Sequence, residues 1–474
     1  MEHASTPTTG SDRRWWILTI VMIAEIMDLL DGTIVNVAGP SLKRELGTSP
    51  SSLQWIIGGY TLALGAGLVL GGRLGDRYGK RPTFLLGMAG FTIASVLCAT
   101  APSTNLLIAY RVLEGLSGAF LLPQGIGFIR QAFPPQDLGK AFAAQGPIYG
   151  LGGILGPIIG GVLIQANWFN LNWRVVFLVN VPVGLFGCVA GYVLLPKGEG
   201  DRRVTIDLFG AAIIAVSSLL LILPLIQGRV DNWAPWTWMS LVGSLLGFYA
   251  FMWRDRVVER AGKTPLVMAS LLGNRHYLVG IGSILLFFSG WTGVSLITTL
   301  FLQIGEHFNA GQAAVANIPF AVASAIGGML SGTVLSDKLG RNTLHLGAVV
   351  QLLGMGLLYV ALGNVTHFSI WHLVPGMTVV GFGFGLIVAA LFQSVLSAIS
   401  NAETGSASGL LAAVQAVGAS AGVAIFGTVF FAKATSGAFA LGFRHAILVE
   451  VIVIVVFMLA ICGLDKQAPT NNWE

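Results

Sequence analysis

Apolar runs of about 20 residues, long enough to cross a bilayer as helices, follow one another along almost the whole sequence. No other feature constrains the fold as strongly. The 474-residue chain is 54% hydrophobic and only 10% charged, with a mean hydropathy of +0.78, whereas soluble domains carry about 25% charged residues. A soluble globular protein is excluded, and the chain is predicted to cross a membrane many times.

Charged, Pro/Gly-rich and Asn-rich stretches separate these runs. The runs begin near Trp15, Leu53, Thr83, Asn105, Gly139, Arg174, Ile206, Trp236, Asn274, Gln312, Thr343, Ser369, Thr404 and Gly442. A membrane-spanning segment must satisfy its own backbone hydrogen bonds, and a β-barrel would show short alternating strands instead. The predicted fold class is therefore an all-α polytopic membrane protein with 14 transmembrane helices.

The distribution of charge predicts the orientation of the chain. The 26 Lys and Arg exceed the 21 Asp and Glu by a net charge of +5, which is too small and too scattered for a nucleic-acid-binding face. Most of the basic residues fall in cytoplasmic segments if the N-terminus is cytoplasmic, so the positive-inside rule predicts that both termini are cytoplasmic. The first apolar run is long and contains three acids, and we interpret it as a spanning helix rather than a cleavable signal peptide.

The residues that usually carry enzyme or metal chemistry are scattered. Cys98, Cys188 and Cys462 are far apart, and each lies inside an apolar run, which excludes a disulfide framework and a CxxC site. The seven histidines form no HExxH motif, no GxSxG motif is present, and residues 262–264 (GKT) lack the remainder of a P-loop. We expect no metal, no cofactor and no enzymatic activity.

An internal repeat predicts the domain organisation. The loops at 72–81 (GRLGDRYGKR) and 333–342 (TVLSDKLGRN) share Leu, Asp, a basic residue, Gly and a second basic residue. They lie eight helices apart, which fits two six-helix bundles separated by two inserted helices. We predict a cytoplasmic N-terminal tail at 1–14, an N-terminal bundle at 15–196, a linker with the inserted helices at 197–257, a C-terminal bundle at 258–464 and a cytoplasmic tail at 465–474.

Four stretches in this order carry a family resemblance. The loop at 72–81 is similar to the signature GxLxDRxGRK between helices 2 and 3, and residues 30–40 (LDGTIVNVAGP) are similar to LDxTIVNVALP in helix 1. Residues 111–115 (RVLEG) resemble RxxQG in helix 4, and residues 152–161 (GGILGPIIGG) match GxxxGPxxGG in helix 5. The chain thus resembles the major facilitator superfamily, specifically its fourteen-helix branch of drug:proton antiporters.

The resemblance implies roles for two of these motifs. The loop residues are expected to act as a conformational latch between the bundles, or otherwise only as a positive-inside anchor. These residues are Gly72, Asp76, Arg77, Gly79, Lys80 and Arg81, with Asp337, Lys338, Gly340 and Arg341 in the second copy. Thr333 replaces the first glycine of the second copy, so that latch is expected to be weaker.

The antiporter motif comprises Gly152, Gly156, Pro157, Gly160 and Gly161. Its glycines at a spacing of four lie on one helix face and permit close backbone approach, and the proline adds a kink. Tight packing is one reading of this motif. The resemblance implies the sharper reading, in which a kinked close contact between the bundles prevents leak and favours exchange.

Ionisable groups at membrane depth are costly and are candidates for function. A rise of about 1.5 Å per residue places Asp31, Arg111 and Glu114 at a similar depth. We expect an ion-pair network in which the proton occupancy of a carboxylate is coupled to substrate, although a purely structural Arg111 with one carboxylate is the alternative. Glu114 stands where the family commonly has Gln.

Other candidates are assigned to a substrate cavity near the membrane midplane. They are Glu25, Asp28, Asn36, Trp55, Tyr60 and Trp291, of which the acids are spaced to face one cavity and the aromatic residues suit a flat cation. Lipid-facing or interfacial positions are the alternative for the aromatic residues. Glu450 in the last helix is expected to pair with Arg444 or His445 rather than to take part in transport.

The expected function is secondary active export. Protons move in as a lipophilic, cationic drug or toxic compound moves out across the bacterial cytoplasmic membrane. The partners are protons, a small-molecule substrate and the bilayer, without nucleic acid, and we expect a monomer. The alternative is a proton-coupled exporter of an endogenous metabolite, antibiotic, amino acid or peptide, since the motifs do not discriminate between these substrates.

Overall fold

The computed structural model describes residues 11–48, 50–134, 137–167, 170–198, 200–228, 231–262, 264–308, 310–363, 368–397, 399–400, 403–434 and 438–464. Helices account for nearly all of these residues, and the described part of the chain contains no strand. The predicted all-α class is confirmed.

The first half of the chain forms a series of helices joined by short connections. They are α1 (Ser11–Leu46), α2 (Pro50–Tyr78), α3 (Lys80–Ala99), α4 (Thr104–Ala132), α5 (Leu138–Ala143), α6 (Gln145–Ala166), η3 (Asn172–Arg174), α7 (Val175–Leu178) and α8 (Asn180–Leu194). Two further helices follow, α9 (Leu208–Gln227) and α10 (Pro235–Arg260).

The second half resumes the same pattern. Its helices are α11 (Ala269–Gly273), α12 (Arg275–Leu300), η4 (Phe301–Gly305), α13 (Ala310–Val315), α14 (Ile318–Leu330), η5 (Ser331–Leu335), α15 (Ser336–Leu339), α16 (Asn342–Ala361), η6 (Ile370–His372), α17 (Val374–Ser397), α18 (Thr404–Ala434) and α19 (Phe439–Ile461).

Many of these helices are long enough to span a membrane. Among the described residues, 11 helical stretches combine sufficient length with sufficient hydropathy. Three further helices, α1, α6 and α10, have 36, 22 and 26 residues and pack beside them. Each of the predicted apolar runs coincides with a helix, and the chain is a multi-pass membrane protein, but the count of 14 spans stays a prediction.

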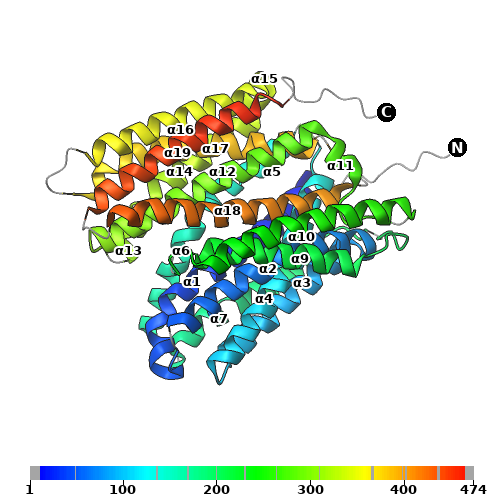
Figure 1. Cartoon of the computed structure of the whole chain (residues 1–474), viewed down its shortest axis with the longest axis horizontal. Helices are drawn as coiled ribbons and strands as arrows, with labels where there is room; N and C mark the ends of the chain where they lie inside the picture. Colours follow the sequence, from blue (N-terminus) through cyan, green and yellow to red (C-terminus); the bar gives the residue numbers. More distant parts are fainter. Residues whose placement is uncertain are drawn as a thin grey trace.

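The helices gather into two bundles with separate packing partners (Figure 1). In the first, α1 packs on α6, α4 and α8, while α4 also packs on α2 and α3. In the second, α12 packs on α18 and α19, and α17 packs on α14 and α16. The exact domain boundaries given above remain predictions.

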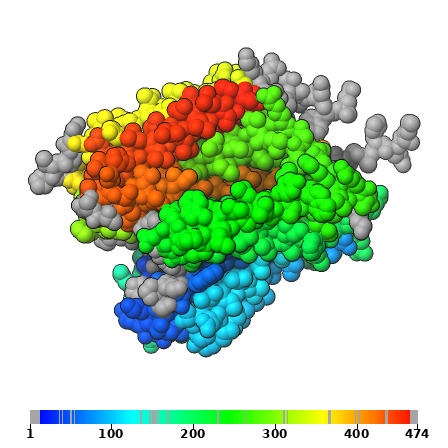
Figure 2. Space-filling view, viewed as in Figure 1, coloured from blue at the N-terminus to red at the C-terminus, as the bar shows by residue number. Residues whose placement is uncertain are grey.

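The helices α9 and α10 form a hairpin that contacts both bundles through α2 and α18. Small hydroxyl residues hold the hairpin together, because Ser240 Oγ donates to the Leu220 carbonyl at 2.7 Å and Ser244 Oγ donates to the Ser217 carbonyl at 2.9 Å. Figure 2 shows the green segment that contains α10 between the blue-to-cyan and the orange-to-red helices on this face.

The two bundles meet most closely near one end of the molecule. We call this the terminal end, because the start of α1 and the end of α19 both lie there (Figure 1). In this region Gly72 of α2 packs on the backbone of Gly405 in α18, and Gly332 in η5 packs on the backbone of Gly139 in α5. A Cβ at Gly72 or Gly332 would lie 2.3 Å from the facing carbonyl oxygen, so these glycines allow the bundles to touch.

Candidate functional site

A cavity of about 260 Å³ lies between the two bundles, and we call it the central cavity. Its walls come from α1, α2, α3, α4 and α6 on one side and from α12 and α18 on the other. The polar or aromatic lining residues that matter here are Glu25, Asp28, Phe84, Gln145, Phe288, Trp291 and Gln415. Among the described lining residues two are acidic and none is basic, so the cavity favours a cation.

The two cavity acids have different partners. Glu25 receives hydrogen bonds from Gln145 Nε2 at 3.2 and 3.3 Å. Asp28 accepts a hydrogen bond from the Tyr60 hydroxyl, and its exposed fraction is 9%. Both carboxyl groups are therefore held in place while they remain at the cavity wall.

Behind the cavity wall lies a fully buried charged cluster of Asp31, Arg111 and Glu114. Arg111 Nη1 donates to Asp31 and, at 2.7 Å, to Glu114, and all three side chains have zero exposed area. The structure brings together the three residues that the depth argument grouped. Since two acids face one base, the cluster is electrically neutral only when one carboxyl group holds a proton.

Neutral polar groups complete this cluster. Asn180 Nδ2 donates to Asp31 at 2.8 Å and to Ser95 Oγ at 3.2 Å, while the Ser95 hydroxyl donates to Glu114. The sequence analysis missed Ser95 and Asn180. Their only signal is that each interrupts or borders an apolar run, and many neutral polar residues in this chain do the same.

Tyr60 connects the buried cluster to the central cavity. Its hydroxyl contacts Asp28, and its ring lies 4.3 Å from the Arg111 guanidinium carbon in a cation–π contact. Arg111 Nε donates to the Ile56 carbonyl at 3.1 Å, while Arg111 Nη2 is buried without a hydrogen-bond partner. Asp28 and Arg111 therefore contact the same side chain, Tyr60, through which a change of charge at Asp28 acts on Arg111.

The structure divides the predicted cavity residues. Glu25, Asp28 and Trp291 line the central cavity, whereas Tyr60 lies behind Asp28 with only 3% exposure. Trp55 is 39% exposed and is not among the described lining residues of the cavity, so the structure places it elsewhere. The side chain of Asn36 lies outside the described residues.

The glycines of the antiporter motif face α1, which belongs to the same bundle. A Cβ at Gly156 would lie 2.0 Å from Thr33 Oγ1, and one at Gly160 would lie 2.7 Å from an Ile34 side-chain carbon. The expected close contact between bundles is therefore corrected to a contact within one bundle. Helix α6 also contacts the second bundle, through α13, α14 and α17.

Among the other three motif positions, the structure describes the surroundings of Gly161 alone. Gly161 faces open space, with no atom within 4 Å of a Cβ built there. The packing of Gly152 and the side chain of Pro157 lie outside the described residues. The helix α6 is continuous from Gln145 to Ala166.

The first copy of the latch motif reaches across to the second half of the chain. Asp76 of α2 accepts a hydrogen bond from the backbone of Gly405, in the first turn of α18. A carboxylate is favourable there, because a helix N-terminus presents unpaired N–H groups and a positive dipole end. Arg73 Nη1 donates to Asp76 at 3.2 Å, and Arg73 Nε donates to the Leu266 carbonyl at 2.6 Å.

The remaining first-copy residues bind the connection that follows α8. Arg77 Nη1 donates to the Val204 carbonyl at 2.8 Å, and Arg81 donates to the Tyr192 carbonyl near the end of α8. Gly79 has a φ of 94°, a conformation that favours glycine, and it separates α2 from α3. Lys80 lies half-buried, and its stem contacts Gly127 of α4.

The second copy of the motif makes contacts within its own bundle. Arg341 Nη1 donates to the carbonyls of Cys462 at 2.9 Å and Leu464 at 2.6 Å, at the end of α19. Gly340 has a φ of 50° and Lys338 is exposed. The side chain of Asp337 lies outside the described residues. The position equivalent to Arg73 is Val334, so this copy has no matching guanidinium.

Arg130 is a second cross-bundle contact at the terminal end, and the sequence analysis did not single it out. It lies near the end of α4, and its Nη1 donates to the Ser400 carbonyl at 2.9 Å and to Thr404 Oγ1 at 2.7 Å. These acceptors lie between α17 and α18. One arginine therefore bonds to the connection between two helices of the other bundle.

Glu450 does not pair as expected. Arg444 lies over the ring of Tyr359, with 4.1 Å between its guanidinium carbon and the ring centre, and no ion pair joins Glu450 to Arg444 or His445 in the described structure. The reason is geometric. Steps of five or six residues rotate a side chain to another face of the helix, whereas steps of three or four keep it on the same face.

A two-bundle helical membrane protein with an acidic cavity between its bundles has the architecture of a transporter rather than an enzyme. The sequence matches the Major Facilitator Superfamily over residues 21–423, and the chain belongs to that family. The resemblance identified from the four motifs is confirmed.

Several relatives cover most of the chain. A protein of Streptomyces coelicolor named "Probable actinorhodin transporter" is 43% identical over 420 residues, which cover 88% of this chain and 73% of the relative. The "Tetracenomycin C resistance and export protein" of Streptomyces glaucescens is 30% identical, covering 91% and 78%. The "Multidrug resistance protein 3" of Bacillus subtilis is 29% identical, covering 90% and 81%.

Solved structures share the fold at low sequence identity. The human organic anion transporter MFSD10 superposes with a TM-score of 0.65 at 16% identity, covering 94% of this chain and 99% of that chain. The proton:xylose symporter XylE superposes with a TM-score of 0.64 at 16% identity, covering 97% of both chains. These structures support the fold alone.

Proposed function

We propose that the protein exports lipophilic, cationic drugs or toxic compounds in exchange for protons, by alternating access of the central cavity. The observation that carries the proposal is the pair of cavity acids, Glu25 and Asp28, with Asp28 linked through Tyr60 to the buried Arg111 cluster. The names of the relatives, which include multidrug and antibiotic resistance proteins, support export of such compounds.

The proposed coupling rests on competition between a proton and a cation for one acidic cavity. A cationic substrate is favoured when Glu25 and Asp28 are ionised, and a proton that enters from the outside neutralises an acid and weakens the hold on the substrate. Asp31, Arg111 and Glu114 are the coupling cluster. Their unequal number of acids and bases leaves a place for one exchangeable proton.

The latch and antiporter motifs receive proposed roles in the access cycle. Asp76 and Arg73 stabilise the state in which the terminal ends of the bundles are in contact. With cytoplasmic termini, this state closes the cavity to the cytoplasm. The glycine face of α6 keeps α1, which carries the cavity acids, at a fixed position inside its bundle.

The setting of this function is part of the proposal. The protein is placed in a bacterial cytoplasmic membrane as a monomer, with both termini in the cytoplasm and with the domain boundaries predicted above. The bias of Lys and Arg toward the loops of the terminal end supports the orientation.

A second candidate is the export of an endogenous antibiotic or related metabolite. The relative of 43% identity, named as a probable actinorhodin transporter, favours it. Both candidates use the same fold and cavity, and they differ in the substrate.

The test is transport by the purified protein in liposomes that contain a pH-sensitive dye. Ethidium is added to wild type, Asp31→Asn, Asp28→Asn and Glu259→Gln, where Glu259 is an exposed residue of α10 and serves as the control. We expect ethidium to trigger proton flux in wild type and control, and this flux to be lost in both Asp variants. Flux with a neutral or anionic antibiotic but with no cation would support the second candidate, and undiminished coupling in Asp31→Asn would refute the role of the buried cluster.

A further inference from the structure

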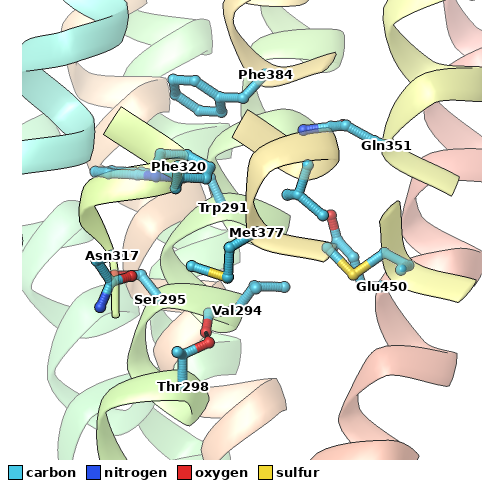
Figure 3. A pocket seen from close by; sticks show the side chains of 12 residues that line it. Trp291, Val294, Ser295, Thr298, Asn317, Phe320, Gln351, Met377, Phe384 and Glu450 are labelled. Carbon is cyan, nitrogen blue, oxygen red and sulfur yellow. Dashed lines mark hydrogen bonds between the residues drawn. The ribbon is translucent and has the colours of Figure 1, made fainter. Parts of the chain in front are cut away.

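A second pocket lies inside the second bundle, and we call it the Glu450 pocket. Figure 3 shows the side chains that line it, which come from α12, α14, α16, α17 and α19 and from the residue preceding α14. They are Trp291, Val294, Ser295, Thr298, Asn317, Phe320, Gln351, Met355, Met377, Val380, Phe384 and Glu450. Among the described lining residues, Glu450 alone can ionise near neutral pH.

Glu450 lies at the middle of α19, which runs from Phe439 to Ile461. At about 1.5 Å per residue its Cα lies roughly 16 Å from either end of the helix, so it sits near the midplane of the span. Its side chain is 4% exposed, and its Oε2 is buried without a hydrogen-bond partner. The carboxyl group packs on the backbone of α12 at Gly290, where a Cβ would lie 2.4 Å from Oε2.

Among the described residues that line the Glu450 pocket there is no Lys, Arg or His. Helix α18 also packs on α19, and its charged residue Lys433 lies in the last turn of that helix. The residues that α12, α14, α16 and α17 contribute to the pocket are uncharged. On α19 itself, Arg444 contacts Tyr359, and on α16 His345 lies beside Cys462 near the terminal end. An ionised carboxylate buried without a cation is strongly unfavourable, so the neutral acid is the stable form in this conformation.

The size of the pocket limits the ligand. Its free volume is about 30 Å³, whereas a cavity needs about 10–15 Å³ to hold one water molecule. A water molecule fits beside the carboxyl group, with Ser295, Asn317 or Gln351 as further polar groups of the lining. A drug-sized compound does not fit, because such ligands occupy pockets of about 300–1,000 Å³.

Trp291 provides a connection to the transport pathway. Its side chain lines both the central cavity and the Glu450 pocket. Its ring lies 5.7 Å from that of Phe384 and 6.0 Å from that of Phe288, so the partition between the two spaces is aromatic. A rotation of Trp291 would join the Glu450 pocket to the central cavity, and water could then reach the carboxyl group.

We propose that Glu450 is a proton-binding site of the second bundle, which exchanges its proton with the central cavity past Trp291. The proposal that Glu450 holds a proton follows from the burial of its carboxyl group and from the Oε2 atom without a hydrogen-bond partner. The exchange step rests on the proposed proton-coupled export. A proton held here would be carried in addition to the one on the Asp31, Arg111 and Glu114 cluster.

The occupancy is tested without transport. Infrared difference spectra of the purified protein at neutral pH are recorded for wild type against Glu450→Gln and, as a control, against Glu259→Gln. We expect Glu450→Gln to remove a protonated-carboxyl C=O band that shifts in D₂O, while Glu259→Gln leaves this band in place. Loss of an ionised carboxylate band in Glu450→Gln would overturn the proposal, and so would stabilisation by Na⁺ at constant pH that requires Glu450.

The exchange step is tested by counting protons moved per substrate in liposomes. We expect Glu450→Gln to lower this ratio by one proton while substrate binding is retained, and Trp291→Phe to slow exchange without changing the ratio. An unchanged ratio in Glu450→Gln would overturn the exchange step. If wild type moves no protons at all, the proposed coupling fails, whereas the infrared result for Glu450 stands. Size-exclusion chromatography verifies that each variant is folded.

Discussion

The buried charged cluster shows how a single residue determines both stability and function. Arg111 compensates two carboxyl groups that have no access to solvent. Removing one member of a buried ion pair leaves a charge without a partner, which typically costs about 3–5 kcal/mol. The acids differ from Arg111 in this respect, since removing one acid leaves a matched pair of Arg111 and the other acid.

We therefore expect Arg111→Gln and Glu114→Gln to behave differently. Arg111→Gln should lower the free energy of unfolding by about 3–5 kcal/mol, because it leaves Asp31 and Glu114 without a cation. Glu114→Gln keeps the Arg111–Asp31 pair and an acceptor for Ser95, so its stability should change by less than about 1 kcal/mol. Thermal unfolding in detergent measures both, and equal losses in the two variants would contradict this account.

Sequence reasoning found the cluster because charge at membrane depth is rare enough to stand out. It missed Asn180 and Ser95, because neutral polar residues in apolar runs are common and cost little when they bond locally. It also misjudged Glu450, since an expected partner was chosen by nearness in sequence. Whether a buried acid has a partner depends on the helices packed around it, and those are set by the tertiary fold.

At the scale of an element, helix α6 shows that spacing identifies a packing face but not the neighbour on it. The glycine spacing predicted close approach, and the structure shows that approach at Gly156 and Gly160. The neighbour is α1 rather than the opposite bundle. Repeated glycines look the same in sequence whichever backbone lies against them.

The same helix provides a matched pair of substitutions. Gly156→Ala should destabilise the protein by about 1–3 kcal/mol, because its Cβ would meet Thr33 Oγ1 at 2.0 Å and the Ile34 amide nitrogen at 2.9 Å. Gly161→Ala, which meets nothing within 4 Å, should be neutral or slightly stabilising, because alanine favours a helix more than glycine. Thermal unfolding of the two variants tests this, and a larger loss at Gly161 would refute the packing.

The hairpin of α9 and α10 depends on a bidentate pair at the terminal end. Arg254 Nε and Nη2 each donate to Asp207 at 2.8 Å, just before α9 begins. Burial opposes ionisation of Asp207, but the hydrogen bonds and charge of Arg254, together with hydrogen bonds from the backbone of Gly210 and Phe209, outweigh it and lower the pKa of this carboxyl group. A lowered pKa means that the pair contributes stability above the unfolded-state value of about 4 and loses it as the pH falls further.

Asp207→Asn should therefore lower stability at neutral pH by about 1 kcal/mol, the upper range for a solvent-accessible pair. The difference between wild type and variant should shrink as the pH falls below about 4. Arg254→Lys, which retains the charge but cannot form the planar fork, should lose part of the same stability. Unfolding curves across pH measure this, and a difference that grows at low pH would exclude the ion pair as its cause.

At the scale of the whole molecule, the sequence predicted the all-helical class and the order of the apolar helices more securely than the relation between the bundles. The loops at 72–81 and 333–342 are a true sequence repeat, yet among the described residues only the first loop bonds to the opposite half through charged side chains. The difference lies in single residues, because Arg73 is replaced by Val334 in the second copy. The two loops therefore differ in their bonds to the opposite half because of residues at positions that the repeat does not specify.

This asymmetry predicts which residues control opening of the terminal end. Asp76 bonds to the first turn of α18, and Arg130 bonds to Ser400 and Thr404. The bond from Arg73 to the Leu266 carbonyl and the glycine packing at Gly72 and Gly332 add to these contacts. A charge at a helix N-terminus is typically worth about 0.3–1 kcal/mol. Asp76→Asn should then shift the ratio of closed to open molecules by a factor of about two to five, and Asp76→Asn with Arg130→Ala by more, because the two contacts act on the same interface.

Spin labels measure this equilibrium directly. Cysteines replace Gln131 at the end of α4 and Lys338 in α15, both exposed, in a protein whose Cys188 and Cys462 are replaced by serine. The population at the longer label distance should rise in Asp76→Asn, rise further in the double variant, and stay unchanged in Glu259→Gln. An unchanged distribution in the double variant would mean that Asp76 and Arg130 do not hold the terminal end closed, and that the glycine packing of Gly72 and Gly332 with the bond from Arg73 is sufficient.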